Sequence, residues 1–143
     1  SAPSKQTYRI PNSASTDLDS AKQQISTEKA KSDALDTKLA AAKEAVQSQR
    51  SQADALQSRL ETLGRQIDID RLNLDPTIHS DLDDFNDKVN RYNTLLRSVR
   101  AENATANELV DSYNTLLEAA KAQDRVVNQL IDNYNAKLRQ YGR

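Results

Sequence analysis

One five-residue phrase occurs four times between residues 82 and 141: Leu82-Asp83-Asp84-Phe85-Asn86, Val89-Asn90-Arg91-Tyr92-Asn93, Val110-Asp111-Ser112-Tyr113-Asn114 and Ile131-Asp132-Asn133-Tyr134-Asn135. Every spacing between the copies is a multiple of seven residues. A seven-residue period is typical of an α-helix that keeps one seam against another helix. The stretch therefore predicts one long helix whose repeated seam residues are Phe85, Tyr92, Tyr113 and Tyr134.

The composition of the whole chain favours the same all-α class. Of its 143 residues, 36% are hydrophobic, 4% aromatic and 29% charged, and the mean hydropathy is −0.83. A compact globule of this length normally has more apolar side chains to bury. Two glycines and three prolines leave few places for turns. Disorder is the alternative for so polar a chain, and the sustained heptads argue against it.

Both expected helices fit a heptad frame, in which the seven positions are lettered a to g. In the first helix the a positions run from Leu18 to Ile67 in steps of seven, and the d positions run from Ala21 to Leu63. In the second helix the a positions run from Leu82 to Leu138 and the d positions from Phe85 to Tyr141. Apolar residues concentrate in these columns, which predicts a coiled-coil seam.

The break between the helices is expected at residues 69–77, where the frame is lost and Asp75-Pro76 opposes helix continuation. The same pair is a suitable helix start, with Asp75 as N-cap and Pro76 in the first turn. We therefore expect an extended lead-in at residues 1–15, a helix at about 16–68 capped by Thr16, a turn at about 69–77 and a helix at about 78–141. Residues 16–143 then form a single helical hairpin.

Two long helices joined by a short turn must run antiparallel. A fold near residue 72 pairs residues whose numbers add to about 145, which places Tyr92 against Ala53 and Tyr113 against Ser32. Large side chains then face small ones. In this register residues 130–141 extend beyond the first helix, so the lead-in is expected to fold back along them. Its only sizeable groups for this role are Tyr8, Ile10 and Pro11.

The g positions of the second helix carry an additional apolar column, which contains Leu95, Leu109, Leu116 and Leu130. Columns a and d suffice for one partner helix, so a third apolar column predicts a further contact. One expected partner is a second copy of the chain, which would give a four-helix bundle. The alternative is a helix of a different protein.

The search for reactive groups predicts no catalytic, cofactor or metal site. His79 is the only histidine and lies beside the turn. Asp81, Asp83, Asp84 and Asp87 are read as a charged first helical turn, because the glycine turn of a calcium loop is missing. The Tyr-Asn phrase is open to two readings, as a recognition surface for a peptide or glycan and as seam packing, and its regular spacing favours packing.

The charge balance also limits the partners. The net charge is −1 with both signs interspersed, which predicts protein partners rather than nucleic acid. No apolar run approaches the roughly 20 residues that cross a bilayer, so no direct membrane insertion is expected. The chain has no cysteine and opens with Ser1-Ala2-Pro3. This opening suggests a processed or excised fragment and favours an exported or extracytoplasmic location over others, although the compartment stays open.

These observations predict a structural coiled-coil module, acting as a scaffold, spacer or oligomerisation domain, and not an enzyme. The alternative is a regulatory or stalk segment of a larger protein, such as a membrane-anchored or exported enzyme or a secretion component, whose active domain lies outside this chain. The repeat resembles those of coiled-coil segments in bacterial proteins, without matching a particular family.

Overall fold

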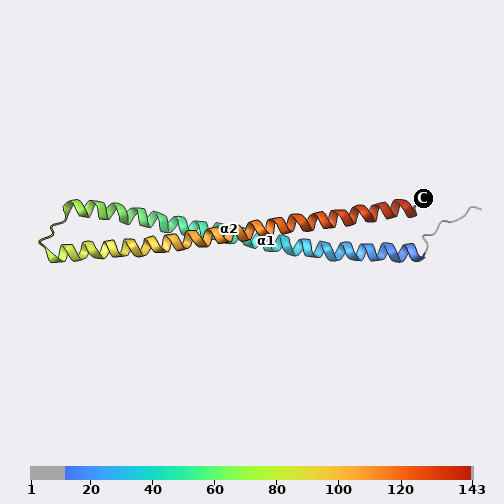
Figure 1. The fold of residues 1–143 in the computed structure, drawn as a ribbon, viewed down its shortest axis with the longest axis horizontal. Helices are drawn as coiled ribbons and strands as arrows, with labels where there is room; N and C mark the ends of the chain where they lie inside the picture. The colour runs from blue at the N-terminus through green and yellow to red at the C-terminus, as the bar shows by residue number, and fades with distance from the viewer. Residues whose placement is uncertain (1–11, 143) are drawn as a thin grey trace, which may run out of the picture. The chain divides into compact units, whose positions relative to one another are not determined.

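The computed structural model describes residues 12–142 and is all-helical within them. Helix α1 spans Asn12–Asn73 and helix α2 spans His79–Tyr141 (Figure 1). The two helices pack against each other as an antiparallel hairpin, which confirms the predicted helical hairpin. The expected packing of Tyr8, Ile10 and Pro11 lies outside the described residues.

The chain reverses in the five residues between Asn73 and His79, where Asp75 closes a tight turn. The backbone carbonyl of Asp75 accepts a hydrogen bond from the amide of Ile78 at 3.2 Å. Its carboxylate accepts bonds from the Thr77 amide at 3.0 Å and from the Thr77 hydroxyl at 2.6 Å. Aspartate readily forms such local bonds, and proline suits the second position of a four-residue turn.

The expected helix caps are therefore wrong at both starts. The first main-chain bond of α2 runs from the Leu82 amide to the Ile78 carbonyl at 3.1 Å, so Asp75 and Pro76 belong to the turn and not to the helix. Thr16 lies inside α1, where its hydroxyl donates to the Asn12 carbonyl at 3.0 Å. Residues 12–15, expected in the extended lead-in, are helical, and α1 continues past Gly64 to Asn73.

The hairpin divides into two units. Unit 2 comprises residues 40–114 and contains the turn, and its most buried apolar side chains are Ala53, Leu60, Ile67 and Val99. Unit 1 comprises the described residues 12–39 and 115–142, and its most buried side chains are Ala14, Leu18, Ser32, Ala120 and Val127. Each unit is thus one segment of α1 packed against one segment of α2.

The buried face of α1 follows the columns expected from the sequence. Every a residue from Leu18 to Ile67 and every d residue from Ala21 to Leu63 is buried or half-buried. In α2 the d column is likewise buried or half-buried from Phe85 to Tyr141. The α2 a column differs, because these four of its residues are exposed: Asn103, Asp124, Ile131 and Leu138.

The predicted register is wrong by about eleven residues. Tyr92, expected against Ala53, lies so close to Gly64 that a Cβ atom on that glycine would be 3.3 Å from the tyrosine ring. Ser32, expected against Tyr113, donates a hydrogen bond to the carboxylate of Asp124. The error arises because α1 continues to Asn73 and the chain turns at Asp75–Thr77 instead of near residue 72.

In the observed register the end of α2, residues 130–141, does not extend beyond the start of α1 as expected. In unit 1 the Lys137 ammonium lies 3.0 Å from the Asp17 carboxylate, and the Tyr141 hydroxyl donates to the same carboxylate at 3.2 Å. The start of α1 therefore accompanies α2 to its last turn.

Candidate functional site

The candidate site is a row of eight α2 residues, which we call the g column. They are spaced by seven and all are half-buried: Lys88, Leu95, Glu102, Leu109, Leu116, Gln123, Leu130 and Lys137. The four leucines predicted as an interaction surface thus lie at the edge of the hairpin seam, where α1 covers part of each side chain. The remaining exposed part of each leucine faces outward.

In unit 2, α1 holds the polar members of the g column. Lys88 forms an ion pair with Asp70. The side-chain amide of Gln49 donates to the backbone carbonyl of Glu102 at 3.2 Å and also to its carboxylate. These bonds fix the α2 side chains on either side of Leu95.

In unit 1 the same types of contact recur, and only in the amide–carboxylate pair are donor and acceptor exchanged between the helices. The side-chain amide of Gln123 donates to the Glu28 carbonyl at 2.9 Å and to its carboxylate at 2.7 Å. The bond from Gln123, together with that from Lys31, lowers the pKa of Glu28. Lys137 forms an ion pair with Asp17 beyond Leu130.

A groove lies beside Leu95 in unit 2. Its volume is about 740 Å³, and Leu63 and Leu95 supply its apolar lining. Arg59 and Arg91 also line the groove, and no acidic residue does. A groove lined by two leucines and two arginines suits an amphipathic helix that has an acidic residue beside its apolar side chain.

A second hollow lies beside Leu130 in unit 1. Its volume is about 290 Å³, and its lining includes Ala21, Leu130 and Tyr134. A leucine of the g column therefore lines an open hollow in each unit. Such hollows receive side chains when another helix packs along the surface.

The α2 column next to the g column is made of small residues. The c positions between the two hollows are all exposed and uncharged: Ser98, Thr105, Ser112, Ala119 and Val126. Small side chains allow another helix to approach closely, so this uncharged strip extends the surface formed by the leucines.

The aromatic seam residues have a packing role in the structure. Phe85, Tyr92, Tyr113 and Tyr134 are all half-buried. The Arg71 guanidinium lies 5.9 Å from the centre of the Phe85 ring, within cation–π range. The asparagines that follow these rings are exposed, so the phrase combines a packed ring with a solvated amide.

The residues considered for chemistry lie around the start of α2. His79 is its first residue and is exposed, as are Asp81, Asp83, Asp84 and Asp87. Among residues 12–142, no group of three or more His, Cys, Asp or Glu side chains is arranged to hold a metal ion. Neither described helix is long and apolar enough to cross a membrane.

Sequence reasoning missed the contacts between polar seam residues. Glu28 and Gln49 occupy d positions of α1, where they weaken an apolar seam, and each has a partner in the g column. The sequence did contain a signal for these contacts. The d column of α1 holds a carboxylate and an amide, Glu28 and Gln49, and the g column of α2 holds an amide and a carboxylate that can pair with them. Without the correct register these pairs could not be matched.

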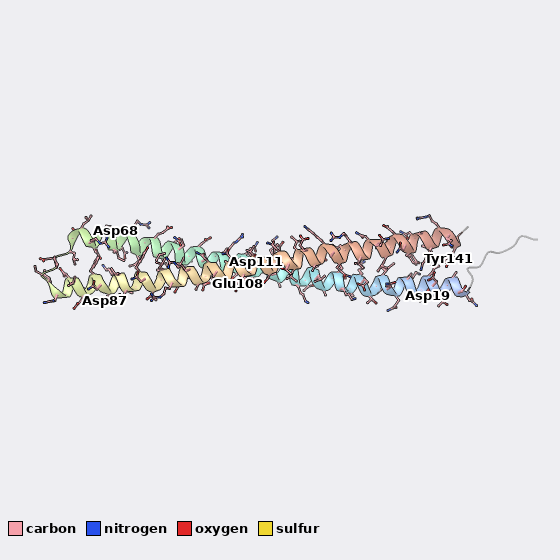
Figure 2. The ribbon with its side chains drawn as sticks, viewed as in Figure 1. Asp19, Asp68, Asp87, Glu108, Asp111 and Tyr141 are labelled. Carbon is pink, nitrogen blue, oxygen red and sulfur yellow. The ribbon has the colours of Figure 1, made fainter. Side chains whose placement is uncertain are left out.

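The end of unit 1 has a contact whose stability depends on pH. The hydrogen bond from Lys137 lowers the pKa of Asp17 below 3.8, and the Tyr141 bond lowers it further. The same bond to Asp17 raises the pKa of Tyr141 above 10.0, with partial desolvation as the second cause. Figure 2 shows Tyr141 on the last turn of α2 and Asp19 near the start of α1.

We predict that this contact stabilises the helix ends only at pH values between the lowered pKa of Asp17 and the raised pKa of Tyr141. The Asp17 contribution is present above pH 3.8 and is lost as the pH falls through its lowered pKa. The Tyr141 contribution is present below pH 10.0 and is lost as the pH rises through its raised pKa. In an NMR titration, Asp17→Asn should return the Tyr141 pKa toward 10.0, whereas the control Asp19→Asn should not. An unchanged Tyr141 titration in Asp17→Asn would contradict the contact.

Comparisons with protein families, with curated proteins and with solved structures find no match to this chain.

Proposed function

We propose that this chain is a structural interaction module, a coiled-coil hairpin that associates through the g column of α2. The leucines of that column form the binding surface, and docked helices would extend each two-helix unit toward a four-helix bundle. The proposal gives the chain a scaffold, spacer or oligomerisation role and assigns it no catalytic step.

The observation that carries the proposal is the exposed part of the leucine column beside an uncharged strip. Leu95 and Leu130 line open hollows, and the neighbouring c positions from Ser98 to Val126 carry no charge. Burying a leucine completely contributes roughly 1.5–3 kcal/mol relative to full exposure, and part of that gain is already realised in the hairpin. Closing the surface with another helix would supply the remainder.

The proposal predicts that association changes the surroundings of these leucines specifically. Methyl NMR signals of Leu95 and Leu130 should shift as the concentration rises from about ten micromolar to one millimolar. Leu56 is the matched control, since it is half-buried in the α1 seam and lies outside the g column. Signals that do not depend on concentration, or that shift equally for Leu56, would contradict association of two copies through the g column and leave a helix of another protein as the partner.

A further inference from the structure

One seven-residue pattern, Arg-x-x-Thr-Leu-x-Arg, occurs twice in the chain, once in each helix of unit 2. In α1 it spans residues 59–65, and in α2 it spans residues 91–97. The groove beside Leu95 is lined by the same five positions of both copies: the residue before the first arginine, that arginine, the threonine, the leucine and the third residue after the leucine. The two copies therefore form two matching walls of one groove.

Both copies also make the same internal contact. In α1 the Arg65 guanidinium donates a hydrogen bond to the Thr62 hydroxyl oxygen at 3.3 Å, and in α2 the second arginine donates to Thr94 at 3.2 Å. Four other helical threonines instead donate their own hydroxyl proton to the backbone carbonyl four residues earlier: Thr16, Thr27, Thr37 and Thr105. The hydroxyls of Thr62 and Thr94 donate to no described residue, so each has a proton to offer to an acceptor in the groove.

The groove holds positive charge that is not paired within the described part of the chain. Arg59 lines the α1 wall and Arg91 lines the α2 wall, and no acidic residue lines either. Neither arginine forms an ion pair with a described residue, and Asp87, four residues before Arg91, forms none. Glu61, two residues after Arg59, accepts a hydrogen bond from Gln57. An anionic group in the groove therefore meets one guanidinium and one hydroxyl donor on each wall.

The arginines are not part of the phrase that repeats along α2. The sequence Tyr-Asn-Thr-Leu-Leu at residues 92–96 recurs at residues 113–117. In the second occurrence, Ser112 and Glu118 take the places of Arg91 and Arg97. The helix thus accepts other residues at these two positions, and both arginines occur only in the copy beside the groove.

We propose that the groove binds an amphipathic helix of another protein, in which a ridge of leucines is flanked on both sides by carboxylates. The ridge packs on Leu63 and Leu95, and a carboxylate on each side accepts hydrogen bonds from the arginine and the threonine of the nearer wall. Because the walls match, both edges of the partner need the same chemistry. The inference rests on the proposed function and names the chemistry of the helix that docks at Leu95.

The spacing of the lining residues favours a helix as the partner. On each wall they recur at intervals of three or four residues, over 58–66 in α1 and 90–98 in α2. Each wall is thus one face of about two helical turns, roughly 12 Å long. A third helix laid along two packed helices places its apolar ridge in such a groove and its edge positions over the two walls. A polyanion such as a nucleic acid would pair with the arginines and leave both leucines without an apolar partner.

Peptide binding tests the chemistry of the partner. Two labelled helical peptides of three heptads carry leucine at positions a and d, with glutamate at e and g in one peptide and lysine there in the other. In fluorescence anisotropy the full chain should bind the glutamate peptide at least about tenfold more tightly than the lysine peptide. Arg59→Glu with Arg91→Glu should reverse that preference, because lysine edges then meet carboxylates on both walls.

The matched control is Arg50→Glu with Arg100→Glu. It makes the same charge change at exposed positions of α1 and α2 in unit 2, outside the groove lining, and should keep the preference for the glutamate peptide. Circular dichroism checks that each variant remains helical, and the comparison of the two peptides on the unmodified chain needs no variant.

Equal binding of the two peptides by the unmodified chain overturns the inference, as does the same loss of preference in both double variants. Failure of both peptides to bind overturns it as well. A Leu95 methyl signal that still shifts with chain concentration would then leave the proposed function standing and reject only this partner.

Discussion

Replacing Leu109 and Leu116 together by glutamate is expected to dissociate the assembled chain into monomers. Both leucines belong to the g column and are half-buried within the hairpin, so each has a remaining part to bury in a partner interface. At about 1 kcal/mol for that part of each side chain, four leucines of a symmetric dimer contribute about 4 kcal/mol. Losing it should weaken association by a hundredfold or more, since about 1.4 kcal/mol corresponds to a factor of ten.

Light scattering at tens of micromolar measures this change, and circular dichroism checks that the helices persist. Glutamate has a good helix propensity, so most of the helical signal should remain. The matched control is Asn107→Glu with Asn114→Glu, which adds the same charge to the same helix at exposed positions outside the g column. Equal association by both double variants would show that the leucine column is not the interface.

Truncating one buried leucine of α1 should strongly destabilise the hairpin. Leu60 is 5% exposed in unit 2, and Leu60→Ala should lower the free energy of unfolding by about 2–4 kcal/mol. Truncating a core side chain removes the favourable free energy of burying it and leaves a cavity that the two helices fill only in part. Urea unfolding followed by circular dichroism gives the change from the transition midpoint.

Leu72 provides the control for this experiment on the same helix. It is 87% exposed, so Leu72→Ala should change the free energy of unfolding by less than about 0.5 kcal/mol. Comparable losses in the two variants would mean that Leu72 is covered by something other than the hairpin, and the account of the fold would then be wrong for that end of α1.

Much of the fold follows from the periodicity of the sequence. The seven-residue spacing of apolar residues identified the inward face of α1 from Leu18 to Ile67 and the aromatic column of α2. The scarcity of glycine and proline predicted one turn near Asp75-Pro76, and the chain does turn there between α1 and α2. These features are local, because each depends on the spacing of side chains along one helix.

The register did not follow from periodicity, since it depends on where the chain reverses. The first helix was expected to end at about residue 68, yet α1 continues to Asn73. A heptad pattern fits several registers that differ by whole turns, and only contacts between distant residues choose among them. The bonds of Glu28 and Gln49 with the g column are such contacts.

The sequence alone also did not show which column beside the d column of α2, a or g, is covered by α1. The a and g columns lie on either side of the d column, and both are apolar enough to pack. In the structure α1 covers the g column throughout, whereas Ile131 and Leu138 of the a column are exposed. The rotation of one helix about its axis relative to its neighbour decides this, and it results from packing summed over both helices.

Sedimentation equilibrium of the unmodified chain is the most direct test of the central claim, that the g column makes this hairpin an association module. Over a concentration range from about one to one hundred micromolar, the account predicts a reversible rise from the 16.0 kDa mass of one chain to twice that mass. A mass that stays at 16.0 kDa throughout would contradict self-association through α2.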